Sequence, residues 1–569
     1  MRRLLAVLFV ALAAPWLMAA AKPATPTVDY RLSPVMREGK LTALAVEIRF
    51  RADPSGQTRL HLPDSYASEK TLWRYVRDLH VDGAQSVTED GPAHRIIRSA
   101  PRATLTVRYQ VVSAVNHEPT EHDGEAFAAW VRPTWFYASG EAVFAVPELP
   151  GDPAARFDWT GAPKGFVFAS DVEHLAGLHR RATRPGTVND ITESALLGGF
   201  DVKLLEIEDH GARLRVAMRG AYGFTGPQLL DLVHKVMDAE RGFWSDGGSP
   251  FLVTVAPLIS GPGSKSLAGS GRSDAFMMSI SPTATVEDLR WILAHENFHT
   301  WNPRQLGGLK DGPDEALGYW FSEGFTDFYA ERLLWRSGLF DAAAFAKSWN
   351  DDLLAYASSS VRREPNERIK ADFWSNREVE KLPYQRGALL AAIWDARLRK
   401  TSGGRVSLDD VMHYQRGLAT AAKGPTTAAD LFVPAAAHFG LDVKDDIARY
   451  VVRGEPIVLD ADVFGPCFRV ETVTSKVFDR GYDTDATSRA DNIVTGLRPD
   501  SPAYAAGLRD GMKLLGRAAG EPGNPDLEYG LKVKDGANER VIRFMPVGKG
   551  TLTSQRLVKA DLAACTTPQ

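Results

Sequence analysis

Apolar and polar residues alternate along much of the N-terminal part of the chain. The stretches 43–50 and 103–109 show the alternation clearly. A period of two residues is typical of strands that bury one face. The region 27–149 is therefore predicted to form a β-sandwich. Residues 201–219 continue the pattern as a hairpin that turns at the Asp-His-Gly sequence 209–211.

The pattern changes after residue 223, where apolar residues recur at helical spacing. The Thr-Gly-Pro sequence 225–227 suits the start of a helix, because threonine caps helices and proline is tolerated in the first turn. A buried strand is predicted at 251–258 and a glycine- and serine-rich loop at 261–271. A largely helical region follows, to about residue 453.

Short strands and turns return in the last hundred residues. The fold class predicted for the whole chain is therefore multidomain α+β. The predicted units are a signal peptide (1–21), an N-terminal β-rich domain (22–222), a mostly helical central domain (223–460) and a small C-terminal β-domain (461–569).

The first residues have the features of an export signal. Met1-Arg2-Arg3 is cationic, residues 4–14 are apolar, and the three alanines 19–21 offer a cleavage site. The alternative is an N-terminal anchor, but the apolar run is too short to span a bilayer. No later segment is long and apolar enough to do so. We expect an exported protein, periplasmic or secreted, without a membrane span in its mature form.

Composition excludes several classes of function. The formal net charge is −4 and no basic stripe is present, which argues against nucleic-acid binding. The two cysteines, Cys467 and Cys565, lie apart from any histidine pattern, so thiol catalysis and cysteine metal ligation are not expected. An exported location permits them to form a disulfide, and two free thiols are the alternative.

The sequence His295-Glu296-Asn297-Phe298-His299 is the candidate metal-binding and catalytic motif. On a helix, residues four apart leave the same face, so both imidazoles can reach one metal ion. Glu296 lies about 100° around the helix, close to the ion without binding it. A general base that takes a proton from an attacking water needs such a position. The alternative is a pair of ordinary surface histidines.

A zinc site of this type needs a third protein ligand and an open fourth position. Glu323 lies in the apolar helical sequence Trp320-Phe321-Ser322-Glu323-Gly324 and is the predicted third ligand of one Zn²⁺ per chain. Asp327, one turn later on the same face, is predicted to hold the outer N–H of a ligating histidine, with a plain salt bridge as the alternative. The rival third ligands are Asp314, Glu315 and Glu331.

These motifs resemble those of a known group of enzymes. The zinc helix followed by Trp-x-x-Glu-Gly-Phe is similar to the gluzincin metallopeptidases, and the sequences 299–302 and 321–327 are similar to the glycyl aminopeptidase family in particular. The resemblance implies a thermolysin-like catalytic domain over 223–460. It also implies release of small N-terminal residues, glycine or alanine, from peptides.

The resemblance assigns one further catalytic residue. In gluzincins of the aminopeptidase type, a tyrosine that precedes a helix stabilises the oxyanion. Tyr384, in Tyr-Gln-Arg-Gly, matches that position, and a phenol donor there is physically reasonable beside a metal. The same four residues recur at Tyr414, which ends a capped helix and is assigned no catalytic role. An ordinary helix-start tyrosine is the alternative for Tyr384.

The segment before the zinc helix departs from the family. The family's Gly-Gly-Leu-Glu-His, whose glutamate helps anchor the substrate amine, is absent from 268–276. Asp274 is the candidate replacement for that carboxylate, while Arg272 would suit a substrate carboxylate. An aminopeptidase needs a carboxylate for the substrate amine, whereas an endopeptidase does not. Without the glutamate, a zinc endopeptidase on the same site is the alternative function.

The sequence 493–512 resembles a PDZ domain, with Ser501-Pro502-Ala503 opening a helix before a Gly-Leu-x-x-Gly turn. Such domains bind extended peptides at a sheet edge, and the alternative is a structural appendage. Two other functions stay open: a peptide-binding envelope protein with a decayed catalytic site, and a hydrolase that acts on something other than peptides.

Overall fold

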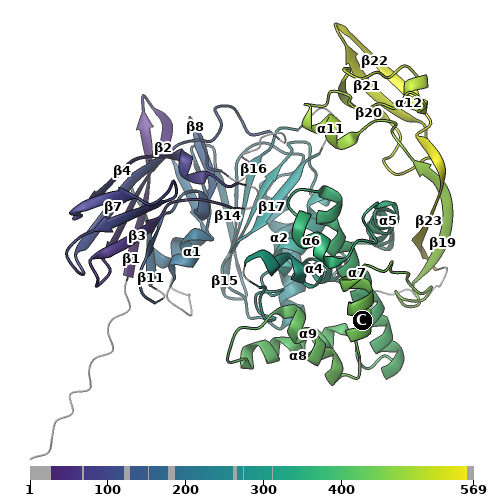
Figure 1. Cartoon of the computed structure of the whole chain (residues 1–569), viewed down its shortest axis with the longest axis horizontal. Coiled ribbons are helices and arrows are strands. Elements are labelled where there is room, and N and C mark those ends of the chain that lie inside the picture. Colours follow the sequence, from purple (N-terminus) through teal and green to yellow (C-terminus); the bar gives the residue numbers. More distant parts are fainter. Residues whose placement is uncertain are drawn as a thin grey trace, which may run out of the picture.

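The computed structural model describes residues 27–66, 69–120, 128–151, 153–176, 186–260, 265–272, 274–310 and 312–560. The predicted signal peptide and Cys565 lie outside these ranges, so the signal and the disulfide stay predictions. The described part is multidomain and α+β, with several β-sheets and one large helical region (Figure 1).

The N-terminal part contains two antiparallel-rich sheets that share one core. Val46 and Ile48 from the first sheet and Leu60 and Ile97 from the second belong to the same buried cluster. The strands expected at 43–50 and 103–109 are confirmed as β2 and β7. In spatial order the first sheet contains β11 (Ala154–Trp159), β1 (Thr27–Arg37), β2 (Lys40–Arg51), β7 (Thr104–Val111) and β4 (Val76–Asp82), and the second contains β10 (Val146–Glu148), β3 (Gln57–His61), β6 (His94–Arg98) and β5 (Ser86–Glu89).

A third sheet joins this region to the central domain. Its residues Trp135 and Leu197 share a buried cluster with Leu252, Ala256 and Met277 of the central sheet. The two sheets therefore pack face to face. The third sheet contains β12 (Val167–Ser170), β13 (Ala195–Gly199), β9 (Trp135–Ser139) and β8 (Trp130–Arg132), and the short helix α1 (Val188–Thr192) precedes β13.

The central sheet has its other face covered by helices. Leu252 and Ala256 face the third sheet, whereas Val253 and Val255 pack with the helices, as the period of two along a strand requires. Its strands are β14 (Lys203–Asp209), β15 (Ala212–Met218), β16 (Phe251–Pro257), β18 (Ala275–Ile280) and, at the edge, β17 (Leu267–Gly271).

Two expectations for this region need correction. The hairpin predicted at 201–219 as a continuation of the N-terminal strands is present as β14 and β15, but β15 pairs in parallel with β16, so the hairpin belongs to the central sheet. The domain boundary at 222 stays a prediction. The segment predicted as a loop at 261–271 contains β17. Its small residues have little strand propensity, and the strand forms by antiparallel pairing with β18, where Gly271 faces Phe276.

The helices of the helical region, from α2 (Gly226–Trp244) to α9 (Ala428–His438), occupy the centre and the lower part of Figure 1. The start predicted at 225–227 is confirmed, because Thr225 and Gln228 form a capping box on α2. The helices are α2 (Gly226–Trp244), α3 (Arg290–Phe298), α4 (Tyr319–Arg336), α5 (Ala342–Ser358), α6 (Asn366–Asp372), α7 (Arg377–Ser402), α8 (Leu408–Ala421), α9 (Ala428–His438) and α10 (Lys444–Asp446).

The C-terminal part, yellow in Figure 1, has its own small core around Val494, Leu508 and Val533. The long pair β19–β23 connects it to the helices, where Asn350 of α5 donates to the Leu557 carbonyl at 2.9 Å. The resemblance to a PDZ domain stays a prediction. The elements are β19 (Phe468–Phe478), β20 (Lys513–Ala519), β21 (Tyr529–Asp535), β22 (Asn538–Phe544), β23 (Val547–Lys559), α11 (Thr484–Arg489) and α12 (Pro502–Ala505).

Among the described residues, the helices are all too short or too polar to cross a membrane.

Candidate metal centre

Three side chains from two helices converge on one point. His295 lies on α3, His299 directly follows α3 with helical backbone angles, and Glu323 lies in the first turns of α4. The two Nε2 atoms are 3.1 Å apart, and Glu323 Oε2 lies 3.5 Å from Nε2 of His295 and 3.3 Å from Nε2 of His299. This is the group of potential metal ligands found within the described residues.

Both imidazoles are held by their outer nitrogens. Nδ1 of His295 lies 2.7 Å from Oδ1 of Asp327, and Nδ1 of His299 donates to the carbonyl oxygen of Asn302 at 2.8 Å. A carbonyl oxygen can only accept, so Nδ1 of His299 carries the proton. The same arrangement at His295 leaves both Nε2 lone pairs directed at the common point, as metal ligation requires.

The charges of the centre are strongly coupled. Burial lowers the pKa of His295, but the carboxylates of Asp327 and Glu323 raise it by more, to well above its usual value. Burial raises the pKa of Glu323, but the two imidazoles lower it below its usual range, so this carboxyl is ionised. Burial raises the pKa of Asp327 against the opposing effect of the His295 hydrogen bond. Without a cation, the two imidazoles and the Glu323 carboxylate share protons among themselves. A bound cation would replace those protons.

Asn302 fixes the relative position of the two ligand-bearing segments. Its fully buried side-chain amide donates to the carbonyl oxygens of Phe321 and Ser322 at 3.2 and 3.1 Å and to Thr326 Oγ1 at 3.1 Å. Its backbone also orients His299, so one residue ties the end of α3 to the start of α4. Sequence reasoning used Asn302 only as part of a motif and missed this role, which a buried polar residue near the ligands could have suggested.

A close helix crossing brings the tyrosine to the ligands. A Cβ added at Gly387 of α7 would overlap the Trp320 carbonyl oxygen and stand 2.7 Å from Gly324 Cα, so α4 and α7 touch backbone to backbone. This contact holds Glu323, next to Gly324, near Tyr384, one turn before Gly387. The Tyr384 ring stacks on the His295 ring with centroids 6.0 Å apart.

The second copy of the tetrapeptide lies elsewhere. Tyr414 stacks on His438, with ring centroids 4.0 Å apart, in the contact between α8 and α9. The structure therefore brings Tyr384, and not Tyr414, to the histidines. Burial raises the pKa of Tyr384 well above its usual value, with the nearby carboxylate of Glu323 adding to the effect, so its phenol is a neutral hydrogen-bond donor.

Glu296 faces the edge strand of the central sheet. A Cβ added at Gly271, the last residue of β17, would stand 3.3 Å from Glu296 Oε2. The absence of a side chain there leaves space beside the carboxylate.

The rival third ligands have other partners. Glu315 accepts a hydrogen bond from the Tyr319 hydroxyl at 2.9 Å, Glu331 accepts from Ser348 at 2.5 Å, and Asp314 pairs with Lys370 at 2.6 Å. Glu323 is the carboxylate that the structure places with the two histidines.

Asp274 and Arg272 lie in the turn between β17 and β18. The peptide nitrogen of Asp274 lies 3.5 Å from Asp171 Oδ2, and its carboxyl contributes, after burial, to raising the pKa of Asp171 to about 7. The buried Arg272 guanidinium forms an ion pair with Glu141, with Nη1 2.7 Å from each carboxylate oxygen. Glu141 was missed by sequence reasoning, because it comes from the N-terminal part and no local motif marks it.

Comparisons with known proteins agree with this centre. Residues 288–383, which contain both histidines and Glu323, match the model of the M61 glycyl aminopeptidase family. This segment is similar to that family, and the chain is a metallopeptidase. A comparison with curated proteins gave no match.

Solved structures of related architecture are known. The metallopeptidase is similar to an aminopeptidase N family protein from Idiomarina loihiensis, with a TM-score of 0.63, 16% identity and coverage of 94% of this chain and 98% of that one. It is also similar to an M1 zinc metallopeptidase from Deinococcus radiodurans, with a TM-score of 0.46, 17% identity and coverage of 76% and 95%. The first likeness shows a shared fold.

Proposed function

We propose that the chain is a zinc-dependent aminopeptidase that holds one Zn²⁺ through His295, His299 and Glu323. The convergence of these three donors carries the proposal. Tetrahedral zinc with bonds of about 2.0–2.1 Å would separate its ligand atoms by about 3.3–3.4 Å. The distances found here, 3.1, 3.3 and 3.5 Å, are close to that value. When bound, zinc polarises the scissile carbonyl and makes a water molecule acidic enough to ionise near pH 7.

Glu296 supplies the proton transfer. It follows His295 directly, so it lies beside the metal centre while its carboxylate faces Gly271 of β17. From there it can accept a proton from the attacking water and pass it to the departing amine. A substrate lying along the edge of β17 would place its scissile bond within reach of this carboxylate.

Tyr384 supplies a hydrogen bond to the developing oxyanion. Its ring packs against His295, and its raised pKa keeps the phenol protonated. A neutral donor in a buried setting is most effective where negative charge develops in the transition state.

Exopeptidase action requires a carboxylate for the free α-amine, because an unpaired ammonium loses hydration without compensation. We assign this role to Glu141. Its partner Arg272 follows Gly271, the residue next to the Glu296 carboxylate. Asp274 instead lies beside Asp171.

Two matched substitutions test the aminopeptidase proposal. Unblocked and N-acetylated glycyl and alanyl peptides would be compared in steady-state kinetics. Hydrogen bonds to charged groups contribute about 1.5–3 kcal/mol, so Glu141→Gln should lower kcat/KM for unblocked substrates about 10- to 100-fold. Asp274→Asn should have little effect.

If Asp274→Asn lowers kcat/KM for unblocked substrates and Glu141→Gln does not, Asp274 is the partner of the substrate amine. If acetylated peptides are cut internally as fast as free ones, the enzyme is an endopeptidase built on the same metal centre.

A further inference from the structure

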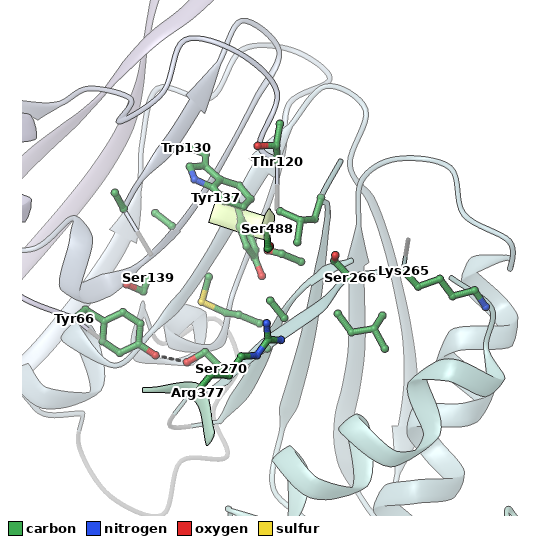
Figure 2. Close-up of a pocket in the computed structure, with 18 of the residues that line it drawn as sticks. Tyr66, Thr120, Trp130, Tyr137, Ser139, Lys265, Ser266, Ser270, Arg377 and Ser488 are labelled. Carbon is green, nitrogen blue, oxygen red and sulfur yellow. Dashed lines mark hydrogen bonds between the residues drawn. The ribbon is translucent and has the colours of Figure 1, made fainter. Parts of the chain in front are cut away.

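A cavity of about 480 Å³ lies beside β17 where three parts of the chain meet (Figure 2). The N-terminal part contributes Trp130 and Tyr137, the helical region contributes Arg377 at the start of α7, and the C-terminal part contributes Ser488. The metal ligands and Glu296 are not among the residues that line it. The cavity is therefore separate from the centre where bond cleavage would occur.

The edge strand connects this cavity to the metal centre. Residues 265–270 line the cavity without interruption, and the next residue, Gly271, lies against Glu296. Because side chains alternate between the faces of a strand, an uninterrupted run shows that the backbone edge borders the cavity. β17 pairs with β18 on its other side. A peptide that pairs with this edge would run from the catalytic base into the cavity.

The two ends of this path differ in charge. Glu296 and Glu323 lie at the metal end, next to the ion pair of Glu141 with Arg272. The cavity is lined by no carboxylate among the described residues, but by two cations, Lys265 and Arg377, and several hydroxyl groups.

Only one of the two cations is available to a ligand. The Lys265 ammonium lies 2.5 Å from Asp288. Arg377 is exposed and has no ion pair within the described part of the chain, and Figure 2 shows its side chain in the cavity near Ser270. Its charge also acts on Glu380, one turn further along α7, but no carboxylate of the described residues lies within salt-bridge distance. A guanidinium without a salt bridge, in a cavity whose described lining has no carboxylate, matches an anionic group with planar oxygens.

The distance along the path fits a short peptide. Arg377 and Tyr384 are seven residues apart on α7, which corresponds to about 10 Å along the helix axis. The strand β17, from Leu267 to Gly271, spans about 13 Å. An extended peptide covers either distance with about three or four residues.

We propose that this cavity binds the C-terminal carboxylate of a short peptide substrate through Arg377, which orients the peptide with its amine at the metal centre. The inference rests on the proposed peptidase function and adds a substrate class to it: oligopeptides of about three to five residues with a free carboxylate. The aromatic side chains of Trp130 and Tyr137 provide an apolar surface for the residues between the two ends.

The test measures binding separately from cleavage. Isothermal titration calorimetry would use the zinc-loaded, full-length Glu296→Gln protein with Gly-Ala-Ala-Ala as the free acid and as the C-terminal amide. The acid should bind about tenfold more tightly, about 1.4 kcal/mol. Adding Arg377→Gln should lower the affinity for the acid to that for the amide. Arg363→Gln is the matched control, since Arg363 is also exposed but lies outside the cavity, and it should keep the tenfold difference.

Two results would overturn the proposal. One is equal affinity for acid and amide; the other is a tenfold difference that survives Arg377→Gln. An amidated peptide with an internal glutamate, Gly-Ala-Glu-Ala, separates the two sources of a carboxylate. If it binds as tightly as the free acid and depends on Arg377, the cavity recognises a side chain and not the terminus.

Kinetics with the unsubstituted protein separate the inference from the proposed function. Cleavage of all these peptides without discrimination between acid and amide would overturn the cavity assignment alone. If no peptide is cleaved but the calorimetric difference is present and depends on Arg377, the carboxylate site stands and the peptidase proposal fails.

Discussion

Gly387 and Gly417 hold the same position in two copies of the tetrapeptide Tyr-Gln-Arg-Gly, yet replacing each with alanine should have opposite effects. Both glycines lie inside helices, where alanine is favoured by about 0.5–1 kcal/mol. A Cβ at Gly417 would meet no atom within 4 Å. Gly417→Ala should therefore stabilise the protein by about that amount.

At Gly387 the same methyl group has no space. It would overlap the Trp320 carbonyl oxygen and stand 2.7 Å from Gly324 Cα, about 0.8 Å inside ordinary carbon contact. The obstructing atoms are backbone, so no rotamer change relieves the overlap. Overpacking costs about 1–3 kcal/mol, and we expect the upper end. After the helix propensity gain, Gly387→Ala should destabilise the protein by about 2 kcal/mol.

Thermal unfolding measures the difference. For a domain the size of the predicted central domain (223–460), a loss of about 2 kcal/mol in the free energy of unfolding lowers the melting temperature by about 4–8 °C. Separating α4 from α7 would also move Tyr384 away from Glu323, and a displacement near 1 Å can cost about 10²-fold in turnover. If Gly387→Ala is as stable and active as Gly417→Ala, the two helices do not touch at this crossing and the arrangement of the centre described here is wrong.

Three further substitutions or measurements test other parts of the structure. Tyr384→Phe should lower kcat by about 10²–10³-fold with the metal retained, whereas Tyr414→Phe should be nearly silent, and the reverse result would exchange their roles. Asp327→Asn should weaken zinc affinity about 10- to 100-fold in a competition titration with a chelator; unchanged affinity would make Asp327 a simple ion-pair partner. Titration of the denatured, unreduced protein should find no free thiol if Cys467 and Cys565 form a disulfide, and two free thiols would exclude it.

The convergence of the three proposed metal ligands was predictable because their geometry is local. Four residues of helix place His295 and His299 on one face whatever surrounds them. Glu323 required one more step, the recognition of a second helix of apolar character. The capped start of α2 was equally local, since Thr225 and Gln228 are three residues apart.

Features that depend on contacts between distant segments were not predictable. The ion pair between Glu141 and Arg272 joins residues 131 positions apart through the packing of two sheets. β17 was expected to be a loop because glycine and serine disfavour strands, and only pairing with β18 makes it one. The hairpin β14–β15 was expected to continue the N-terminal strands, because its alternation predicts strands but not the sheet that they join.

The zinc content and turnover of three single variants test the central claim most directly. Glu296→Gln should keep one zinc per chain and lose at least about 10²-fold in kcat, because it removes the base and no ligand. Glu323→Ala should lose the metal, while Glu315→Ala, which removes only a partner of Tyr319, should keep it. Retention of zinc by Glu323→Ala together with its loss from Glu315→Ala, or full turnover of Glu296→Gln, would contradict the account.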